Sequence, residues 1–321
     1  MQLASSAPER NIVGLDIALV SNDNGVGLST DMDLLTGVFE AAGHRVERVY
    51  WEETTMRQVD LLIFLELFNP KLIKFSKKSV GIFNMEWFGS RWLPYLGNLD
   101  QIWAKSEEAH TLFKGMRLPV VYTGFMSKDH FDPTIERTDT ALHVRGRSTA
   151  KNTAAVINAW QLNPNLPPLT IITATALGTP SYINVVGRQT PEQLKWHMNT
   201  HRFHICPSLV EGWGHYITEG ALCEALVITT DGSPMNEHIT PDCGILIDTL
   251  APTLHGGTLV NEYKIAPVIL SEAVEWASKL DRQEADDMGR AARQRVLDRA
   301  DTFVATVLEQ LDVLFPERSL R

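Results

Sequence analysis

Apolar runs alternate with amphipathic stretches along the first part of the chain, and polar or glycine-containing turns separate them. The most apolar run, LLIFLELF at 61–68, is too short to cross a membrane and contains Glu66, which favours a buried parallel strand. A helix over 30–42 would end at Gly43, and Ser106 would cap the start of another. The alternation predicts a doubly wound α/β domain. Its expected strands cover 15–21, 45–51, 59–65, 80–84, 101–105 and 119–123.

A second alternating series follows the polar segment MSKDHFDPTIERTD at 126–139, which predicts a linker. This series extends to about residue 250, and Thr190 caps a predicted helix over 190–199. Because 321 residues exceed the size of a usual single core, we expect two domains that face a cleft. The expected segments are a first domain over 1–130, a second over 131–300, a terminal stretch over 301–321, and late helices at about 267–279, 282–297 and 301–314.

The composition is that of a folded protein with an acidic surface. Hydrophobic residues make up 44% of the chain and charged residues 21%, which argues against a disordered or fibrous protein. The formal net charge of −10 does not indicate nucleic acid or an anionic membrane as a partner, because both favour basic surfaces. A small or neutral partner fits this charge better.

The cysteines and the chain start predict a cytoplasmic location. Cys206, Cys223 and Cys243 give an odd count without paired spacing, as expected for free, buried thiols in a reducing compartment. The start MQLASSAPERNIVG has no basic segment followed by an apolar core, so no secretory signal is predicted. No apolar run reaches the length of a membrane span.

The most informative segment is ICPSLVEGWGHYITEGALCEALVITTD at 205–231, whose pattern predicts strand, loop, helix and strand. Glu211 and Glu219 stand eight positions apart in it, while Gly212 and Gly214 let the backbone approach a ligand closely. Free N–H groups and the positive end of a helix converge at such a loop, which favours an anion. The two acids could then hold sugar hydroxyls beside a bound phosphate.

A second segment, LHVRGRSTAKNTAAVINAW at 142–160, predicts a strand that ends at Gly146, followed by a helix. Arg147 and Lys151 lie between the two, where basic groups can neutralise a diphosphate. Arg145 is an alternative to Arg147 in this role, and a pair of ordinary surface cations is the structural alternative.

The two segments together resemble retaining glycosyltransferases with the GT-B fold, typified by glycosyltransferase family 4. The glutamate-pair motif of that family is close to P-S-x-x-E-G-F-G-x-P-x-x-E-A, and this chain departs from it at His215 and Tyr216. The family also often has G-R-x-x-x-x-K-G, where this chain has its lysine one place earlier and Asn152 in place of glycine. The glutamate-pair residues in register are Pro207, Ser208, Glu211, Gly212, Trp213, Gly214 and Glu219.

The resemblance implies two Rossmann-like domains, with the final helix crossing back to the first. It implies that Glu211 holds the donor sugar and Glu219 the ribose, while Arg147 and Lys151 stabilise the leaving diphosphate. Retaining transfer in similar enzymes is thought to use that phosphate as the base, so no dedicated base residue is needed. The resemblance also implies a nucleotide-diphosphate sugar as the co-substrate, with neither a metal nor a cofactor expected. The implied donor-binding positions are Glu219, Gly212, Trp213, Gly214, His215, Tyr216, Thr218, Gly187, Arg188, Gly25 and Gly27.

Glu86, in FNMEWFGSRW at 83–92, is expected where a strand of the first domain ends toward the cleft. Its carboxyl group could orient or deprotonate an acceptor hydroxyl, and an acid that only holds loop backbone is the alternative. Trp87 and Trp92 could stack on a sugar or belong to the core. By resemblance, the loop over 229–238 also brings Glu237 near the site.

Other functions are considered beside this one. The turn NGVGLST at 24–30 lacks a complete three-glycine fingerprint, which disfavours a dehydrogenase. His197, His201 and His204 have a spacing that suggests zinc, but a helix followed by a strand would point them apart. The sugar, the base, the acceptor and the oligomeric state stay open, as do an epimerase, a hydrolase or a non-catalytic sugar-nucleotide-binding module on the same scaffold.

Overall fold

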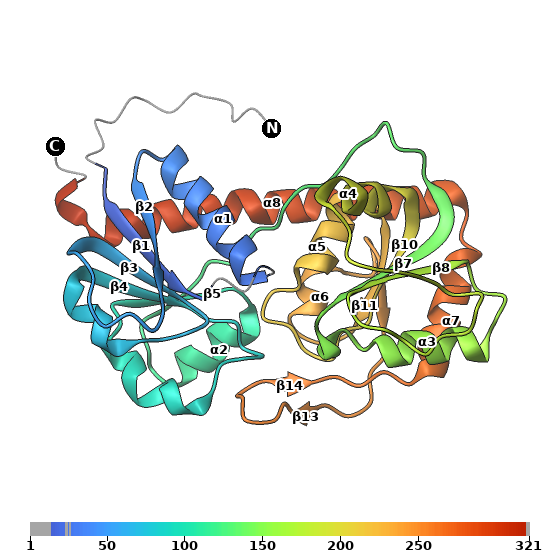
Figure 1. Cartoon of the computed structure of the whole chain (residues 1–321), viewed down its shortest axis with the longest axis horizontal. Coiled ribbons are helices and arrows are strands. Elements are labelled where there is room, and N and C mark those ends of the chain that lie inside the picture. Colours follow the sequence, from blue (N-terminus) through green and yellow to red (C-terminus); the bar gives the residue numbers. More distant parts are fainter. Residues whose placement is uncertain (1–13, 23–24, 26, 319–321) are drawn as a thin grey trace.

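The computed structural model describes residues 14–22, 25 and 27–318, and its strands form two parallel six-stranded sheets in separate halves of the molecule (Figure 1). This confirms two doubly wound domains. The first sheet has the order β2-β1-β3-β4-β5-β6, from β1 (Asp16–Ser21), β2 (Arg45–Tyr50), β3 (Val59–Leu65), β4 (Ser76–Ile82), β5 (Gln101–Ala104) and β6 (Val120–Tyr122). The second has the order β12-β11-β10-β7-β8-β9, from β7 (Thr138–Gly146), β8 (Leu169–Thr173), β9 (Asn184–Val186), β10 (His201–Cys206), β11 (Leu226–Thr230) and β12 (Ile245–Ile247).

The helices begin where the sequence places caps. Ser106 Oγ accepts a hydrogen bond from the Ala109 amide, and Thr190 forms a reciprocal capping box with Gln193. The α-helices are α1 (Gly27–Ala41), α2 (Glu107–Gly115), α3 (Thr153–Leu162), α4 (Pro191–Thr200), α5 (His215–Leu222), α6 (Met235–His238), α7 (Pro267–Ser278) and α8 (Arg282–Leu314). Short 3-10 helices cover Pro70–Phe75, Ser90–Asn98, Thr149–Lys151 and Pro316–Arg318.

Strand β4 begins earlier than the predicted range of 80–84. Its first residues include Lys77 and Lys78, and two charged residues do not fit the apolar pattern from which the strand was predicted. In the fold their ammonium groups reach Asp60 and Asp100, at 2.8 and 2.9 Å, so both lysines are accommodated at the start of a central strand. Tertiary ion pairs thus override the sequence pattern here.

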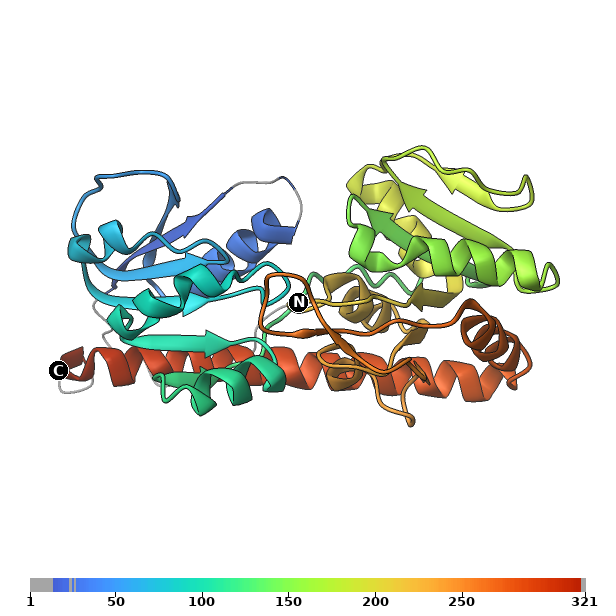
Figure 2. The same cartoon turned by 90° about the horizontal axis from the view of Figure 1, so that it is seen from below.

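Helix α8 is one continuous helix of 33 residues, where two helices over 282–297 and 301–314 were expected. Neither glycine nor proline interrupts the helix at the expected break, and Thr302 Oγ1 donates to the Asp298 carbonyl 2.8 Å away. Figure 2 shows α8 running along both halves of the molecule. Its first half packs Ala292 and Val296 in the second domain, and its second half packs residues into the core of the first. Those residues are Phe303, Val307, Leu311 and Leu314.

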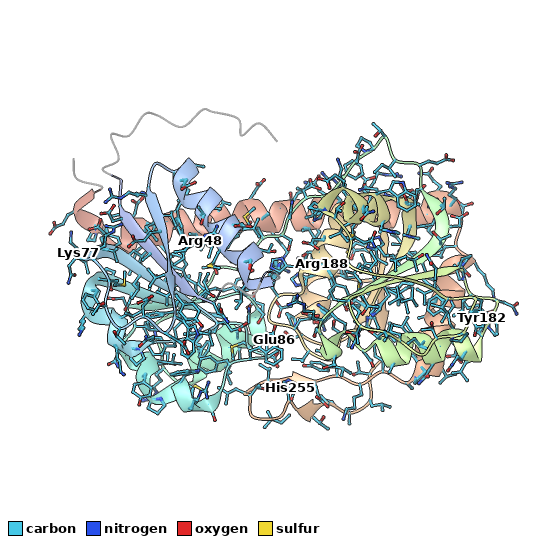
Figure 3. All side chains as sticks on the ribbon, viewed as in Figure 1. Arg48, Lys77, Glu86, Tyr182, Arg188 and His255 are labelled. Carbon is cyan, nitrogen blue, oxygen red and sulfur yellow. The ribbon has the colours of Figure 1, made fainter. Side chains whose placement is uncertain are left out.

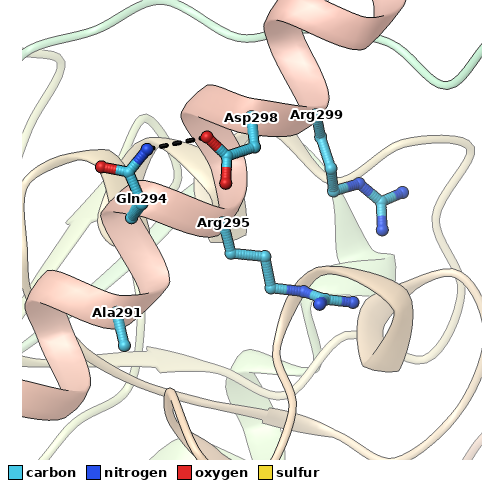
Figure 4. A pocket seen from close by; sticks show the side chains of 5 residues that line it. All are labelled: Ala291, Gln294, Arg295, Asp298 and Arg299. Atoms are coloured by element: carbon cyan, nitrogen blue, oxygen red, sulfur yellow. Dashed lines mark hydrogen bonds between the residues drawn. The ribbon is translucent and has the colours of Figure 1, made fainter.

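Two arginines attach the middle of α8 to the second domain, beside a surface pocket (Figure 4). The Arg295 guanidinium donates to the carbonyls of Glu237 and His238, which end the short helix α6. Arg299 donates to the Glu237 carbonyl and to Tyr122 Oη in the first domain. Cations at the C-terminal end of a helix satisfy its last carbonyls.

A hairpin of β13 (Thr253–Leu254) and β14 (Asn261–Glu262) extends from the second domain below α2 (Figure 1). Its Val260 is buried in a core cluster of the first domain, and Leu259 packs against the same cluster. The hairpin therefore joins the two domains on the side opposite α8. Within the residues that the structure describes, no helix is long and apolar enough to cross a membrane.

Candidate functional site

The site forms where the carboxyl ends of the two sheets approach each other, which is where parallel sheets bind ligands. Lys151 ends the 3-10 turn that follows β7, and Asn152 after it has a left-handed backbone with φ of 56°. Asparagine adopts this conformation more readily than most residues, which explains how it replaces the glycine of the resembling motif. The turn directs Lys151 toward the loop that carries Glu211.

Lys151 and Glu211 form the centre of the site. Lys151 Nζ lies 2.5 Å from Glu211 Oε1 and 3.7 Å from the centre of the Tyr216 ring. Ser208 Oγ donates to the same Oε1 at 2.5 Å and also lies 2.5 Å from Tyr216 Oη. Among the described residues no hydrogen bond is formed to Glu211 Oε2, so one oxygen is fixed and the other is available to a ligand.

Gly212 brings this loop against the first domain. A Cβ atom at Gly212 would lie 2.3 Å from Glu86 Oε2 and 2.9 Å from Asn84 Cα, so only glycine fits. Figure 3 shows Glu86 at the junction of the two halves. Its Oε2 is fully enclosed and has no hydrogen-bond partner in the described structure. Burial, together with the nearby Glu211 charge, raises the pKa of Glu86 to about 8, so Glu86 holds a proton at neutral pH.

A buried ionic network beneath the loop was not predicted from the sequence. Asp31, on α1, lies 2.6 Å from Lys105 Nζ and 2.7 Å from His215 Nε2. The other ring nitrogen of His215 lies 2.7 Å from Ser127 Oγ, in the segment between the domains. Burial opposes a charge on Asp31, but Lys105 and His215 outweigh it and lower its pKa. His215, a departure from the resembling motif, therefore joins the two domains.

The sequence held one signal of this network, because Lys105 directly follows the buried strand β5. A lysine at such a position is almost never fully buried unless it is paired. Its partners lie 74 and 21 positions away, in Asp31 and Asn84, which only the fold brings together.

The structure brings only some of the four predicted charged groups into contact. Arg147 is exposed, and no ion pair holds it among the described residues. Arg145, its alternative, donates to Thr173 Oγ1 at 3.2 Å. Glu219 is half-buried on α5, with Oε1 3.9 Å from His130 Nε2, and burial raises its pKa. Lys151 and Glu211 thus form a pair, while Arg147 and Glu219 do not touch it.

The remaining motif side chains support the loop. Trp213, predicted as a donor-binding residue, has its side chain in the core, where Nε1 donates to Ser127 Oγ at 3.1 Å and the ring packs on His238. Thr218 is fully buried and its Oγ1 lies 2.7 Å from Ser127 Oγ. Gly214 has φ of 96° and is the N-cap residue that precedes α5. The side chains of Trp213 and Thr218 therefore position the loop from behind.

Second-rank candidates lie at the edges of the site. Gly187 and Arg188 follow β9 and are exposed, and Arg188 lies on the side of the second domain that faces the first (Figure 3). Gly25 has φ of 65° and its amide donates to Ser29 Oγ at 2.8 Å, while Gly27 begins α1. Glu237 accepts hydrogen bonds from the Glu107 amide in the first domain, so it joins the domains.

The histidines and cysteines have structural environments. His197 and His201 stack with ring centres 5.6 Å apart, while His204 Nε2 lies 3.1 Å from the Met198 carbonyl. Within the described part of the chain, no group of three His, Cys, Asp or Glu side chains is arranged to hold a metal ion. All three cysteines are free and buried, as predicted.

Neither a protein-family model nor a curated protein matches this sequence. Solved structures match its fold over nearly the whole chain. One is a glycosyltransferase from Rickettsia africae, with TM-score 0.75 and 13% identity, covering 94% of this chain and 99% of that one. Sucrose-phosphate synthase from Thermosynechococcus elongatus has TM-score 0.72 and 12% identity, covering 94% and 99%. HepE from Anabaena, solved with UDP and glucose, has TM-score 0.68 and 14% identity, covering 93% and 100%.

The expected GT-B fold is therefore confirmed. The two parallel-sheet domains of this chain align with these glycosyltransferases over nearly their whole length. At such low identity the likeness concerns the fold, and function has to be argued from the site.

Proposed function

We propose that this chain is a glycosyltransferase that moves a sugar from a nucleotide-diphosphate sugar to an acceptor hydroxyl, with retention of anomeric configuration. The observation that carries the proposal is the Lys151–Glu211 pair, fixed by Ser208 and Tyr216 and facing Glu86 of the other domain. A cation and a carboxylate held together at the ends of parallel strands suit a phosphate-linked sugar. HepE, similar in fold, has been solved with UDP-glucose, which makes a uridine donor the first to test.

In the proposed reaction, the acceptor oxygen bonds to the anomeric carbon on the face that the diphosphate leaves. The bond from that carbon to the phosphate oxygen breaks, its electron pair stays on the diphosphate, and the hydroxyl proton passes to the same oxygen. Lys151, joined by the exposed Arg147, stabilises the growing charge, which is where preorganised cations contribute most. Glu211 holds the sugar and Glu219 the ribose. Glu86, protonated at neutral pH, orients the acceptor as a hydrogen-bond donor and does not deprotonate it.

The test begins with thermal shifts of the full chain against a panel of nucleotide sugars, because the ligand that stabilises it most is the donor. Turnover with that donor is then compared between wild type and Lys151→Ala. We expect Lys151→Ala to lower kcat by about 10²-fold or more. Because the buried Glu211 carboxylate then lacks its cation, turnover is measured well below the melting temperature of the variant. Lys279→Ala is the matched control. Lys279 is the C-cap residue of α7, and its Nζ also lies 2.5 Å from a glutamate oxygen, but its side chain is 68% exposed. Near-normal turnover in Lys151→Ala would remove the proposal.

The alternatives give different results with the same donor. A hydrolase or an epimerase consumes the donor without an acceptor, and a binding module is stabilised by the nucleotide without any turnover. The mechanism is independent of metal, so we expect activity to survive EDTA. The free thiols suit a reducing compartment, and we propose a cytoplasmic location, which microscopy of a tagged full chain would check.

A further inference from the structure

Three neighbouring strands of the first sheet end in polar residues that the donor-side mechanism does not use. Glu66 follows β3, Asn84 follows β4 and Lys105 follows β5, and these strands pair in that order. Asn84 Nδ2 donates to Glu66 Oε2 at 3.0 Å, and Asn84 Oδ1 accepts from Lys105 Nζ at 2.8 Å. The amide is thereby fixed in one orientation, and it holds one oxygen of Glu66 in place.

Glu66 is held at a cost to the backbone. Its φ of 61° lies in the left-handed region, which residues other than glycine and asparagine rarely adopt because Cβ then crowds the backbone. Glu66 is half-buried, its burial raises its pKa, and Oε1 makes no hydrogen bond among the described residues. Strain of this kind concentrates at ligand sites. The structure therefore presents a second carboxyl oxygen, in addition to that of Glu211, that is oriented and available.

Trp87 belongs to the same turn, because its amide donates to the Asn84 carbonyl at 3.0 Å. The side chain of Trp87 is 65% exposed, whereas Trp92 packs edge-on against Phe68 in the core. Glu86, between Asn84 and Trp87, contacts Gly212 of the second domain, which places the turn at the domain junction. An exposed indole on the same turn as the fixed Asn84 amide is suited to the apolar face of a sugar ring whose hydroxyls reach that amide.

The charges at these strand ends disfavour an anionic acceptor. Lys105 is 1% exposed, and its ammonium group is occupied by Asp31 and Asn84 and covers the Phe125 ring at 4.2 Å. A phosphate or carboxylate on the acceptor would meet the Glu66 carboxyl group there, without access to this cation. Repulsion between like charges in a confined site weakens the binding of such partners.

We propose that the acceptor is an uncharged sugar or polyol whose hydroxyls bind Glu66 and Asn84 and whose ring face stacks on Trp87. This inference rests on the proposed function, because it concerns the acceptor side of the same cleft. It assigns Glu66, Asn84 and Trp87 to acceptor recognition, a role separate from that of Lys151 and Glu211.

The experiment is a glycan array probed with the full chain in the presence of UDP, in which neutral saccharides are printed beside their phosphorylated or sulfated counterparts. We expect binding to neutral members, and at least tenfold weaker binding to each charged counterpart. Trp87→Ala should lose at least tenfold in affinity for the bound glycan, and Glu66→Gln should lose a similar amount. Preference for the charged members, or binding to no glycan, would overturn the inference.

Matched variants separate recognition from folding. Trp276→Ala removes a tryptophan that is 54% exposed on α7, and Glu52→Gln changes an exposed glutamate of the first domain; both should bind glycans as wild type does. Stabilisation of Trp87→Ala and Glu66→Gln by the nucleotide sugar should equal that of wild type. If the nucleotide sugar stabilises the chain but only anionic glycans bind, the acceptor inference fails alone. If no nucleotide sugar stabilises it, the proposed function fails as well.

Discussion

Replacing Glu86 with glutamine should stabilise the protein at alkaline pH and leave it unchanged at acidic pH. The folded structure raises the pKa of Glu86 from 4.5 to about 8, through burial and the Glu211 charge. A raised pKa means that the folded state binds the proton more tightly than the unfolded chain does. The stabilisation is then complete below about pH 4.5 and is lost as the pH rises through about 8. Glutamine carries no charge at any of these pH values and escapes that loss.

The pKa sets an upper limit on the effect. Each pKa unit corresponds to about 1.4 kcal/mol, so the rise to about 8 limits the loss to about 5 kcal/mol. Charged groups inside proteins are described best by an effective dielectric constant well above that of a dry interior, so we expect Glu86→Gln to gain less than this limit, about 2 kcal/mol at pH 9. For domains of this size, that gain corresponds to roughly 4–8 °C in Tm.

Calorimetric melting at pH 5, 7 and 9 measures the difference between Glu86→Gln and wild type. Taking the difference cancels the titration of other groups, such as Glu108, whose burial raises its pKa to about 7. Glu52→Gln serves as the exposed control and should show no difference at any pH. The reasoning is refuted if Glu86→Gln melts at the same temperature as wild type at pH 9, or if its gain is as large at pH 5.

Three further predictions concern the buried network, the left-handed turn and the terminal helix. Lys105→Ala leaves Asp31 buried without its cation and should cost about 3–5 kcal/mol in urea unfolding. Lys77→Ala, from an exposed surface pair, should leave the unfolding curve nearly unchanged, and equal losses in the two variants would contradict the network. Asn152→Gly should stay within about 1 kcal/mol of wild type in stability, because glycine adopts φ of 56° freely, while Asn152→Val should be clearly less stable. Thermal melting compares the two variants, and the opposite order of stability would rule out the left-handed conformation at this position. Phe303→Ala removes a fully buried side chain from the core of the first domain and should lower the free energy of unfolding by about 3–5 kcal/mol. We expect faster amide hydrogen exchange in β1 and β3, and faster exchange confined to the second domain would disprove the packing.

The sequence predicted the elements well because the relevant signals are local. Ser106 and Thr190 cap their helices as expected, and the loop from Glu211 to Gly214 joins β10 to α5. The Lys151–Glu211 contact was expected only through the resemblance, since the two residues are 60 positions apart. Motif spacing identified this pair, and the fold brought it into contact.

Contacts between the domains could not be predicted from local patterns. His215 was assigned to the donor, yet its ring lies between Asp31 and Ser127, 184 and 88 positions away. Trp213 was assigned in the same way, and its side chain fills the junction behind the loop. A polar or aromatic side chain in a glycine-rich loop can face either the ligand or the core, and only the neighbouring domain decides between them.

Helix α8 has a consequence for synthesis on the ribosome. The apolar cluster around β1 and β3 is completed by Phe303, Val307 and Leu311, which are translated almost three hundred residues after β1. Domains generally fold in the order of their translation. Here the apolar surface of the amino-terminal domain stays uncovered until those residues emerge from the exit tunnel. Chaperone dependence of the nascent chain should therefore persist until Leu311 has left the exit tunnel.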